Sequence, residues 1–454
     1  MGGDHVAAWH KNGLVLNRNR CLIVFGRYPV PGRTKTRLIP VLGPAGAAEL
    51  QREMTEKILD VAMAAGFTPV RFCYAGGTLR QVRRWIKRPG LHIERQADGD
   101  LGRRMHQAMA SAMEQGYRQV VLMGTDVPSV ANDHLRAAFD SLQNNDMVLG
   151  PSLDGGYWLI GLRRPADLFT DIAWGTDRVL EQTLAAGHRL KLRTAQLAPL
   201  QDIDNHNDLA ELPSHIHSPK PYLSVVIPAL NEAANIETAI QSARCDDCEI
   251  IVVDGGSKDR TAACAQAAGA RVIPAPMGRA FQQNRGARKA GGKVLLFLHA
   301  DSRLPDNYCS YLFETLMDSR TVAGAFQFKT DLPNWSMRLI ETAARIRSAW
   351  FQMPYGDQGL FLRKDVFDGI GGFTPVPIAE DLFLVRRLAR MGRIGLAPVP
   401  VVTSGRRWRT IGIWRATLIN YLIAGGCLMR VPARYLAPLY TLWTKPREGR
   451  KELK

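Results

Sequence analysis

Short apolar runs, each followed by a polar loop and a helical pattern, recur along the chain. Cys21–Phe25 and Leu223–Pro228 open two such series. Uninterrupted apolar runs are typical of strands buried on both faces, and their alternation with helices indicates a parallel sheet covered by helices. The pattern therefore predicts an α/β protein with two doubly wound, mostly parallel domains in tandem. Further strand candidates are Val120–Met123 and Met147–Leu149 in the first series, and Glu249–Val253 and Lys293–Leu298 in the second.

A proline-rich stretch separates the two series. Leu212–Pro221 holds three prolines among polar residues, so it cannot sustain a helix or a central strand. A chain of 454 residues also exceeds the size at which a single hydrophobic core keeps growing. The predicted organisation is a disordered extension over 1–19, a first domain over 20–212, a linker over 213–221, a second domain over 222–409 and a basic amphipathic helical tail over 410–454.

The tail is rich in positive charge. The whole chain has a formal net charge of +17, and residues 404–454 contain eleven Lys or Arg against two Glu. Such a segment attracts anionic lipid or phosphorylated ligands. Because no RNA-binding or helix-turn-helix signature accompanies the charge, we expect no nucleic-acid partner. Ile411, Trp414, Leu418 and Leu422 form one helical stripe, which predicts either a helix packed on its own domain or peripheral contact with an anionic membrane.

The expected cellular compartment follows from the lack of a secretory or membrane-spanning signal and from the cysteine content. The first twenty residues lack the apolar core of a secretory signal, and the uncharged stretch over 416–429 is too short to span a membrane. Seven scattered cysteines favour a reducing compartment, and the lone pair Cys245 and Cys248 indicates a loop thiol pair rather than zinc. We expect a cytoplasmic protein, with peripheral attachment to the inner face of the plasma membrane left open by the tail.

Polar groups follow successive strands of the second series. They are Pro228–Glu232, Asp254–Ser257 and His299–Asp301. Ligands of open α/β sheets bind at the carboxyl ends of the strands, where carboxylates can hold a nucleoside and a divalent cation. Turn formation explains any one of these pieces alone. Three pieces in register predict a nucleotide site.

With these motifs, residues 222–409 resemble the family-two glycosyltransferases of GT-A fold, and are most similar to the transferases associated with arsenosugar biosynthesis. The family motifs IPxxNE, DGGSxDxT and DxD correspond here to Ile227–Glu232, Asp254–Thr261 and His299–Asp301. His299 replaces the first Asp of the usual DxD, so it contacts the diphosphate or only packs. The resemblance implies a nucleotide-sugar donor and a divalent cation, Mg²⁺ or Mn²⁺, with Asp301 as the metal ligand. The implied donor-binding residues are Pro228, Glu232, Asp254, Ser257 and Asp301.

Two further groups belong to this predicted site. Arg279 and Arg285, in the segment after Gly278, either face phosphate or are solvated. Glu380 and Asp381 precede a helical pattern over 382–391, and a carboxylate there can deprotonate an acceptor hydroxyl or simply cap the helix.

The family has its catalytic Asp in this ED motif, which implies Asp381 as the base, Glu380 beside it, and inversion of configuration. Tyr355–Gly359 resembles the family's acceptor-side loop, in which Asp357 and Gln358 would bind the acceptor, an unknown small molecule or lipid. Arg406–Trp408 resembles part of the QxxRW motif of processive enzymes, but the Gln is absent, so we infer no polymerisation.

The first domain carries a different loop after its opening strand. Gly26–Leu38 is shaped by glycine and proline and contains four cations, which favours either a nucleotide phosphate site or a charged surface loop. Residues 20–212 look like the companion transferase-like (DUF2064-type) family of the same arsenosugar context, itself similar to nucleotidyltransferases. Asp126 and Asp204 are predicted to hold one Mg²⁺, with Asp154 nearby. The four cations are Arg27, Arg33, Lys35 and Arg37.

The sequence therefore predicts an enzyme in which an inverting glycosyltransferase is fused to a nucleotidyltransferase-like domain. That first domain would supply or bind the activated donor, which makes the protein bifunctional if the domain is catalytic. One alternative keeps the glycosyltransferase active and makes the first domain an inert nucleotide-binding or regulatory module. Another treats the whole chain as a non-catalytic nucleotide-binding scaffold at a membrane surface.

Overall fold

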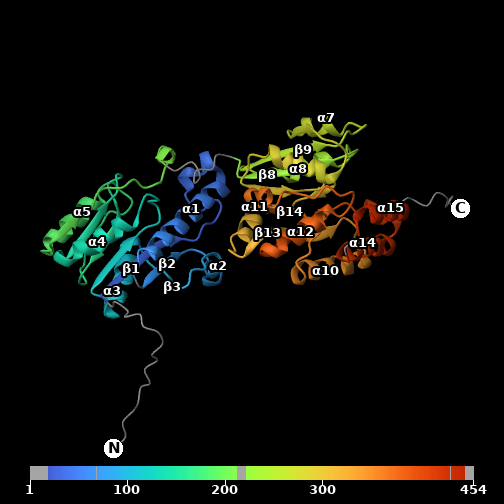
Figure 1. Cartoon of the computed structure of the whole chain (residues 1–454). Helices are drawn as coiled ribbons and strands as arrows, with labels where there is room; N and C mark the ends of the chain where they lie inside the picture. Colours follow the sequence, from blue (N-terminus) through green and yellow to red (C-terminus); the bar gives the residue numbers. More distant parts are fainter. Residues whose placement is uncertain (1–18, 68, 212–220, 430, 445–454) are drawn as a thin grey trace, which may run out of the picture. The chain divides into compact units, whose positions relative to one another are not determined.

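A computed structural model describes residues 19–67, 69–211, 221–429 and 431–444. The expected extension lies outside the described residues except for Asn19, as do the linker except for Pro221 and the end of the tail from residue 445. The chain divides into two compact units, residues 1–28, 51–82 and 88–210 in the first and residues 29–50, 83–87 and 211–454 in the second. Each unit holds one mixed but mostly parallel sheet (Figure 1), which confirms the predicted fold class.

The first sheet has the strand order β3-β2-β1-β4-β6-β5-β7. The first four strands of this order are mutually parallel, β6 is antiparallel to both β4 and β5, and β7 is parallel to β5. The central strand β1 is buried from Cys21 to Gly26, as its apolar run predicts. The strands are β1 Arg20–Arg27, β2 Val70–Ala75, β3 Leu91–Arg95, β4 Gln119–Met123, β5 Met147–Pro151, β6 Tyr157–Leu162 and β7 Thr194–Gln196.

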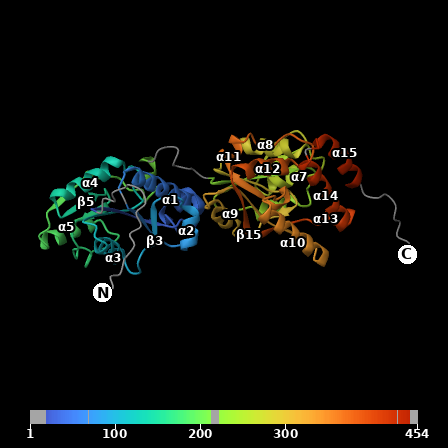
Figure 2. The ribbon, with the colours of Figure 1, turned by 60° about the horizontal axis from the view of Figure 1, so that its bottom comes forward.

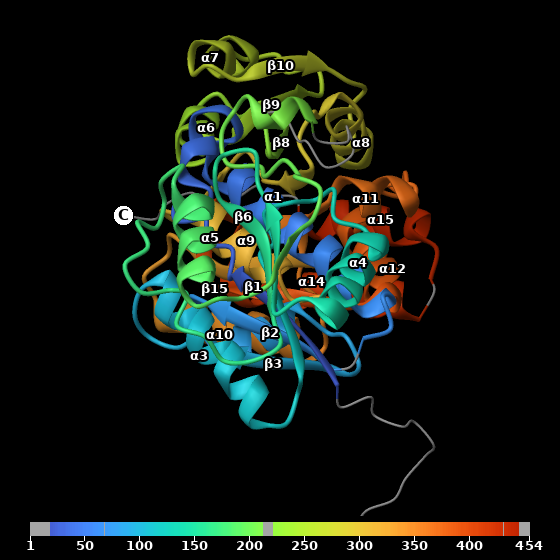
Figure 3. The ribbon, with the colours of Figure 1, turned by 90° about the vertical axis from the view of Figure 1, so that its left-hand side faces the viewer.

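Helices cover both faces of the first sheet, and Figure 3 shows α5 and α4 on opposite sides of it. Met105 of α3 and Ala186 of α5 pack in one apolar cluster with Ile23 of β1. The carboxylate of Asp100 accepts the N–H of Arg103 at 2.8 Å and so caps α3. The helices in the described part of the chain before residue 212 are α1 Ile39–Ala64, α2 Leu79–Trp85, α3 Leu101–Glu114, α4 Asn132–Asn144 and α5 Val179–Arg189, with 3-10 turns η1 Thr36–Leu38 and η2 Asp208–Glu211.

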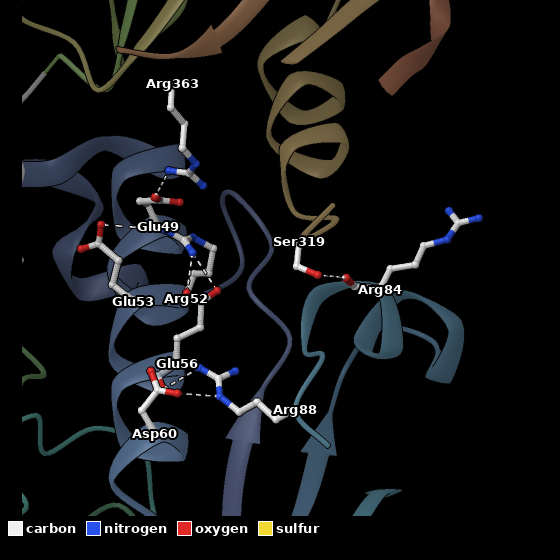
Figure 4. Close-up of polar contacts among 9 residues, drawn as sticks. All are labelled: Glu49, Arg52, Glu53, Glu56, Asp60, Arg84, Arg88, Ser319 and Arg363. Atoms are coloured by element: carbon white, nitrogen blue, oxygen red, sulfur yellow. Dashed lines mark hydrogen bonds and ion pairs between the residues drawn. The ribbon is translucent and has the colours of Figure 1, made fainter. Parts of the chain in front are cut away.

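Ion pairs along α1 stabilise the first unit (Figure 4). Nη1 of Arg52 lies 2.7 Å from Oε1 of Glu56, one turn further along the helix. Arg88, in the segment before β3, bonds Oδ1 of Asp60 at 2.7 Å and the carbonyl oxygen of Glu56 at 3.0 Å. Arg88 therefore ties the start of β3 to α1.

The second sheet has the strand order β10-β9-β8-β11-β14-β13-β15-β12. The first four strands of this order are parallel, β14 is antiparallel to β11 and β13, β15 is parallel to β13, and β12 is antiparallel to β15. The carboxyl ends of β8, β9 and β11 therefore lie at one edge, where ligands of such sheets bind. The strands are β8 Leu223–Ala229, β9 Cys248–Asp254, β10 Arg271–Pro274, β11 Val294–Phe297, β12 Ser302–Arg303, β13 Thr321–Thr330, β14 Leu360–Arg363 and β15 Arg393–Thr403.

Helices α8, α11 and α12 cover one face of the second sheet, with α9 and α10 on the other (Figure 2). Ala287, Phe367 and Leu384 bring the first three helices into one core cluster with the strands. The helix predicted after Glu380 is α12. The helices are α6 Ile236–Ser242, α7 Thr261–Ala267, α8 Arg279–Lys289, α9 Tyr308–Leu316, α10 Trp335–Trp350, α11 Lys364–Gly369, α12 Glu380–Met391, α13 Arg406–Ile411, α14 Ile413–Leu428 and α15 Ala433–Thr444, with the 3-10 turn η3 Gly356–Gln358.

The tail forms three helices rather than one continuous stripe. Gly412 has a φ of 94°, a backbone conformation that L side chains rarely adopt, and it separates α13 from α14. Over the residues that the structure describes, no helix combines the length and the apolar character needed to cross a membrane.

The lone CxxC pair lies just before and at the start of β9. Sγ of Cys245 is 2.8 Å from Sγ of Cys309 on α9, and the Cys248 thiol faces the carbonyl oxygens of Ala243 and Cys245. The pair is thus part of a small thiol cluster in the second unit.

Candidate functional site

Two of the predicted donor loops are tied to each other by hydrogen bonds. The carboxylate of Asp254 accepts the N–H and the hydroxyl of Ser257, and the Ser257 hydroxyl accepts the N–H of Asn231 at 2.9 Å. Oδ1 of Asn231 in turn accepts the N–H of Lys258 at 2.8 Å. Asp254 and Ser257 thereby brace the loop that carries Glu232, and neither of them lines the two cavities described below.

Glu232 lies where this braced loop meets the tail. Its Oε1 is 2.6 Å from Nη2 of Arg406, and its Oε2 accepts the Asn235 amide at 2.6 Å. The Glu232 side chain is 17% exposed and the Arg406 side chain is 56% exposed. The pair therefore presents a fixed carboxylate and a solvated guanidinium at the same edge of the site.

The first cavity, of about 630 Å³, lies at the carboxyl ends of β8 and β11. The predicted donor residues Pro228, Glu232, Arg279 and Asp301 all line it. Gln282 fixes α8 beside these strands, because its side-chain amide donates to the carbonyl oxygens of Ala229 and Val253.

A second cavity, of about 360 Å³, adjoins the first. The predicted acceptor-side and catalytic residues Asp357, Glu380 and Asp381 line it. The two cavities share a wall, so a ligand in one would lie against a ligand in the other. The shared residues are Arg279, His299, Asp301, Arg407 and Tyr440.

His299 and Asp301 lie in that shared wall, both partly exposed. Burial, and then the Arg279 guanidinium, lower the pKa of His299 to about 3, so its imidazole is neutral. Burial, and then the Glu232 carboxylate, raise the pKa of Asp301. His299 therefore presents a neutral imidazole nitrogen to both cavities, and Asp301 presents a carboxylate whose negative charge is disfavoured by its surroundings.

Glu380 and Asp381 begin α12 but differ in their surroundings. Oδ2 of Asp381 accepts the N–H of Gly356 at 2.5 Å, and Oδ1 accepts the N–H of Leu382 at 2.8 Å. Glu380 is 6% exposed, and burial, followed by the Asp381 carboxylate, raises its pKa to about 7. Two backbone donors thus orient the Asp381 carboxylate at the second cavity, whereas Glu380 is held in a site that disfavours its charge.

The two predicted residues of the acceptor-side loop, Asp357 and Gln358, lie in different surroundings. Asp357 lines the second cavity, and burial raises its pKa to about 6. Its Oδ1 is buried without a hydrogen-bond partner among the described residues, so it can accept from a bound hydroxyl.

Gln358 is fully buried and lies in neither cavity. Its Oε1 accepts from Arg347 at 2.9 Å and from Ser348 at 3.0 Å, and its Nε2 donates to the carbonyl oxygen of Phe326. Gln358 therefore fixes the η3 turn through buried hydrogen bonds. The sequence had predicted that it would contact the acceptor.

The two predicted arginines of α8 are also placed differently. Arg279, the first residue of α8, lines both cavities, and its charge lowers the pKa values of Glu380 and Asp357 against the larger effect of burial. Arg285 is partly exposed further along the helix and lines neither cavity. Arg279 is thus the α8 cation that faces a ligand.

The acidic side chains of the site bear on whether it can hold a divalent cation. Asp301 and His299 face both cavities, but no group of three or more His, Cys, Asp or Glu side chains in the described part of the chain can hold a metal ion. Magnesium-type sites commonly use one or two carboxylates and complete their shell with substrate phosphate and water. Asp301 fits such a site when the ligand itself brings oxygen atoms.

The cationic loop of the first domain is shaped by a tight turn. The N–H of Arg33 donates to the carbonyl oxygen of Val30 at 3.0 Å, and the Thr34 hydroxyl accepts the N–H of Val30 at 2.9 Å. Arg27 is exposed at the end of β1, Arg33 and Arg37 are exposed, and Lys35 is partly exposed. Arg27 belongs to the first compact unit and the other three to the second, so their joint role stays a prediction.

Asp126 and Asp204 approach each other through the backbone. The N–H of Ile203, next to Asp204, donates to the carbonyl oxygen of Asp126 at 2.9 Å, and both Asp residues are partly exposed. Asp154 is exposed in the turn between β5 and β6, where its Oδ1 accepts the N–H of Gly156. The structure thus brings the backbone at Asp126 beside the residue that precedes Asp204, and the cation shared by their carboxylates stays a prediction.

Some residues of the site were not among those predicted. Arg406 and Arg407 belong to α13, and their sequence signal was a partial QxxRW motif without its Gln. Tyr440 comes from α15 and carries no motif at all. Long-range packing of the tail brings Tyr440 to the cavities, so local sequence could not have located that residue.

Two family models match separate parts of the chain. The family described as "Uncharacterized protein conserved in bacteria (DUF2064)" matches residues 58–176, and "Glycosyl transferase family 2" matches residues 224–377. These matches confirm the expected combination of a DUF2064-type part with a glycosyltransferase family 2 domain, and they support the assignment of the chain as a transferase.

Individual relatives cover parts of the chain. A PGL/p-HBAD biosynthesis glycosyltransferase of Mycobacterium bovis (strain BCG / Pasteur 1173P2) is 32% identical over 170 residues, which is 34% of this chain and 64% of the relative. A structure provisionally described as a nucleotide-diphospho-sugar transferase, from Desulfovibrio desulfuricans G20, is 36% identical with a TM-score of 0.39, over 41% of this chain and 83% of that one. The mannosyltransferase PcManGT of Pyrobaculum calidifontis, in complex with GDP-Man and Mn²⁺, is 17% identical with a TM-score of 0.38, over 52% of this chain and 79% of that one.

Proposed function

We propose that the second unit transfers a sugar from a nucleotide-sugar donor to an acceptor hydroxyl, with inversion of configuration. The observation that carries this proposal is the pair of adjoining cavities with a shared wall. One cavity is lined by four of the predicted donor residues, the other is lined by the predicted base, and Arg279, His299 and Asp301 lie between them. Group transfer between two bound substrates needs this arrangement, because both must be held in contact while water is kept away.

The first cavity suits the donor diphosphate. Arg279 and Arg406 supply positive charge there, and Asp301 would hold a Mg²⁺ or Mn²⁺ ion together with oxygens of the diphosphate. When bound, that cation would offset the negative charge that develops on the leaving nucleoside diphosphate. Glu232, held by Arg406 and Asn235, would accept hydrogen bonds from the nucleoside.

The second cavity suits the acceptor. Asp381 would accept the proton of the attacking hydroxyl, with its carboxylate oriented by the N–H groups of Gly356 and Leu382. Asp357 would accept a hydrogen bond from another acceptor hydroxyl through its unpartnered Oδ1. A base on the acceptor side that activates the hydroxyl for direct attack on the donor corresponds to a single displacement, and therefore to inversion.

The direct test is release of nucleoside diphosphate by the purified full-length chain. It should be incubated with Mn²⁺ and, in turn, with uridine, guanosine and thymidine diphosphate sugars. Slow hydrolysis of the donor identifies its nucleobase even when the acceptor is not known. Release from one nucleotide class above a boiled control supports the proposal. No release from any donor, with or without acceptors, would favour the non-catalytic scaffold.

For the acceptor, we propose to begin with organoarsenical compounds, because the sequence resembles transferases associated with arsenosugar biosynthesis. Sugars and lipid phosphates form the comparison panel. An arsenical that accelerates nucleotide release above donor hydrolysis would support this context, and acceleration by a member of the comparison panel alone would remove it.

For the first domain, we propose that it makes or holds the activated donor that the second domain consumes. Asp126 and Asp204 would hold the cation for nucleotidyl transfer, and the backbone hydrogen bond from Ile203 to Asp126 supports this assignment. The full-length chain, given nucleoside triphosphates, sugar 1-phosphates and Mg²⁺, should release pyrophosphate, and Asp126→Asn should reduce that release. Glycosyl transfer without any pyrophosphate release would identify the first domain as an inert nucleotide-binding or regulatory module.

A further inference from the structure

Helices α10, α14 and α15 turn large apolar side chains toward solvent. On α10, Trp335 is 69% exposed and Trp350 is 82% exposed, and Phe351 directly follows the helix with 69% exposure. On α14, Trp414 is 60% exposed, with Leu418 and Leu422 on the same side one and two turns further along. On α15 the exposed apolar side chains include Leu439 and Leu442. Large exposed apolar side chains gathered on neighbouring helices mark a binding surface.

Helices α10, α14 and α15 pack together, and Figures 1 and 2 show them in the same part of the second unit. Their exposed residues therefore belong to one region. The rings of Trp335 and Trp414 meet edge to face with centroids 6.5 Å apart. Ala416 of α14 shares a core cluster with Met337 of α10, and Leu436 of α15 packs against Gly426 of α14. The inward side chains of these helices are therefore buried against each other, whereas the outward apolar side chains remain exposed.

The same region is positively charged. Between residues 404 and 444 the sequence has six arginines and no acidic residue. Arg434 on α15 is exposed, and so are Arg338 and Arg345 on α10. The acidic Glu341 of α10 accepts hydrogen bonds from the backbone and hydroxyl of Thr330. Asp331, just before α10, is engaged by Arg409 at 2.9 Å. Exposed tryptophan and leucine beside Arg434, Arg338 and Arg345 match a surface of apolar chains and anionic headgroups.

We propose that α10, α14 and α15 form a docking surface for an anionic lipid bilayer. The tryptophan and leucine side chains would enter the headgroup and upper acyl region, and the arginines would bind lipid phosphate. Because no described helix can span a membrane, the contact is peripheral. A second copy of the chain is a poorer occupant, since a two-fold contact would bring the arginine-rich faces against each other.

The docking surface also adjoins the second cavity. Asn420, Ile423 and Ala424 of α14 and Tyr440 of α15 line that cavity with their inward sides. A bilayer on the outward sides would therefore lie next to the helices that enclose the proposed acceptor site. Docking itself does not depend on glycosyl transfer, so it can be tested without any substrate.

The test is sedimentation of the full-length chain with vesicles of phosphatidylcholine alone or of phosphatidylcholine with phosphatidylglycerol. We expect binding to the anionic vesicles that weakens as salt is raised. Trp414→Glu/Leu418→Glu should lower the bound fraction about tenfold or more, because two exposed apolar side chains that would enter the bilayer become negative charges beside lipid phosphate. Trp350→Glu, at a separate and more exposed position, should lower it as well.

The matched control is Leu79→Glu/Leu190→Glu, two exposed leucines of the first unit. It should bind vesicles like the parent, and all variants should keep the parent's circular dichroism and melting midpoint. Equal binding by the docking variants and the control would overturn the proposal. So would the absence of anionic vesicle binding combined with a concentration-dependent dimer that Trp414→Glu/Leu418→Glu dissociates, because that result assigns the surface to a second copy.

Discussion

The backbone N–H of Gly356 donates a hydrogen bond to Oδ2 of Asp381, and this contact joins the acceptor-side turn to the first turn of α12. A Cβ on Gly356 would lie 3.1 Å from Oδ2 of Asp381 and 3.2 Å from Nε2 of His299. The absence of a side chain at position 356 thus lets the backbone approach both groups.

Gly356→Ala should therefore reduce turnover more than stability. The added methyl group would displace the Asp381 carboxylate by a fraction of an ångström, and misplacement near the reacting atoms can cost up to about 10²-fold in rate. We expect a lower kcat with an almost unchanged melting midpoint. Gly369→Ala is the matched control, because a Cβ there meets nothing within 4 Å. Equal loss in both variants would show that the contact has no particular role.

The buried Glu380 should give stability a dependence on pH. Its pKa rises from 4.5 to about 7 in the folded chain, chiefly through burial. Between these values the folded state binds a proton that the unfolded state has released, so stability falls as pH rises from about 4.5 to 7 and then levels off.

Glu380→Gln should remove this contribution. The variant should gain stability relative to the parent above pH 7, with little difference below pH 4.5, when melting midpoints are compared across that range. A difference between the two proteins that stays constant with pH would contradict the assignment.

Arg406 should matter for donor binding and little for folding. Its ion pair with Glu232 is partly solvated, so Arg406→Ala should change the free energy of unfolding by less than about 1 kcal/mol. Because Arg406 lines the first cavity, the same variant should weaken donor binding by about tenfold, measured by calorimetry.

Arg409→Ala is its counterpart. Arg409 lies on the same helix, is 59% exposed, pairs with Asp331 at 2.9 Å and lines neither described cavity. It should bind donor like the parent. Comparable weakening in the two variants would point to general loss of positive charge rather than to a contact in the cavity.

The proposed cation ligand gives a separate prediction. Chelation of divalent ions should abolish nucleotide release, and Asp301→Asn should raise the Mn²⁺ concentration for half-maximal activity by at least about tenfold. Asp306→Asn, at an exposed position of the following loop, should leave that concentration unchanged. Full activity in the presence of chelator would refute the role given to Asp301.

The sequence was informative wherever local pattern decides structure. The apolar run Cys21–Phe25 lies within β1, and Leu223–Pro228 forms most of β8. The helix predicted from the apolar spacing after Glu380 is α12. The strand ends then gathered Pro228, Glu232 and Asp301 at one cavity, because parallel strands end at the same edge of a sheet.

It was less informative wherever distant segments meet. The buried hydrogen bonds of Gln358 depend on Arg347, Ser348 and Phe326, which no local pattern connects to it. Tyr440 reaches the site through the packing of α14 and α15, and the continuous stripe expected from Ile411 is broken at Gly412.

A comparison of two Asp variants distinguishes a base at Asp381 from a carboxylate that only caps α12. Nucleoside diphosphate release and donor binding should be measured for the full-length parent, for Asp381→Asn, and for Asp365→Asn. Asp365 likewise stands in the first turn of its helix and accepts the next N–H, but lines neither cavity. We predict that Asp381→Asn binds donor like the parent and transfers sugar about 10²- to 10⁴-fold more slowly, while Asp365→Asn is unchanged. Transfer by Asp381→Asn at the parent's rate would contradict the account.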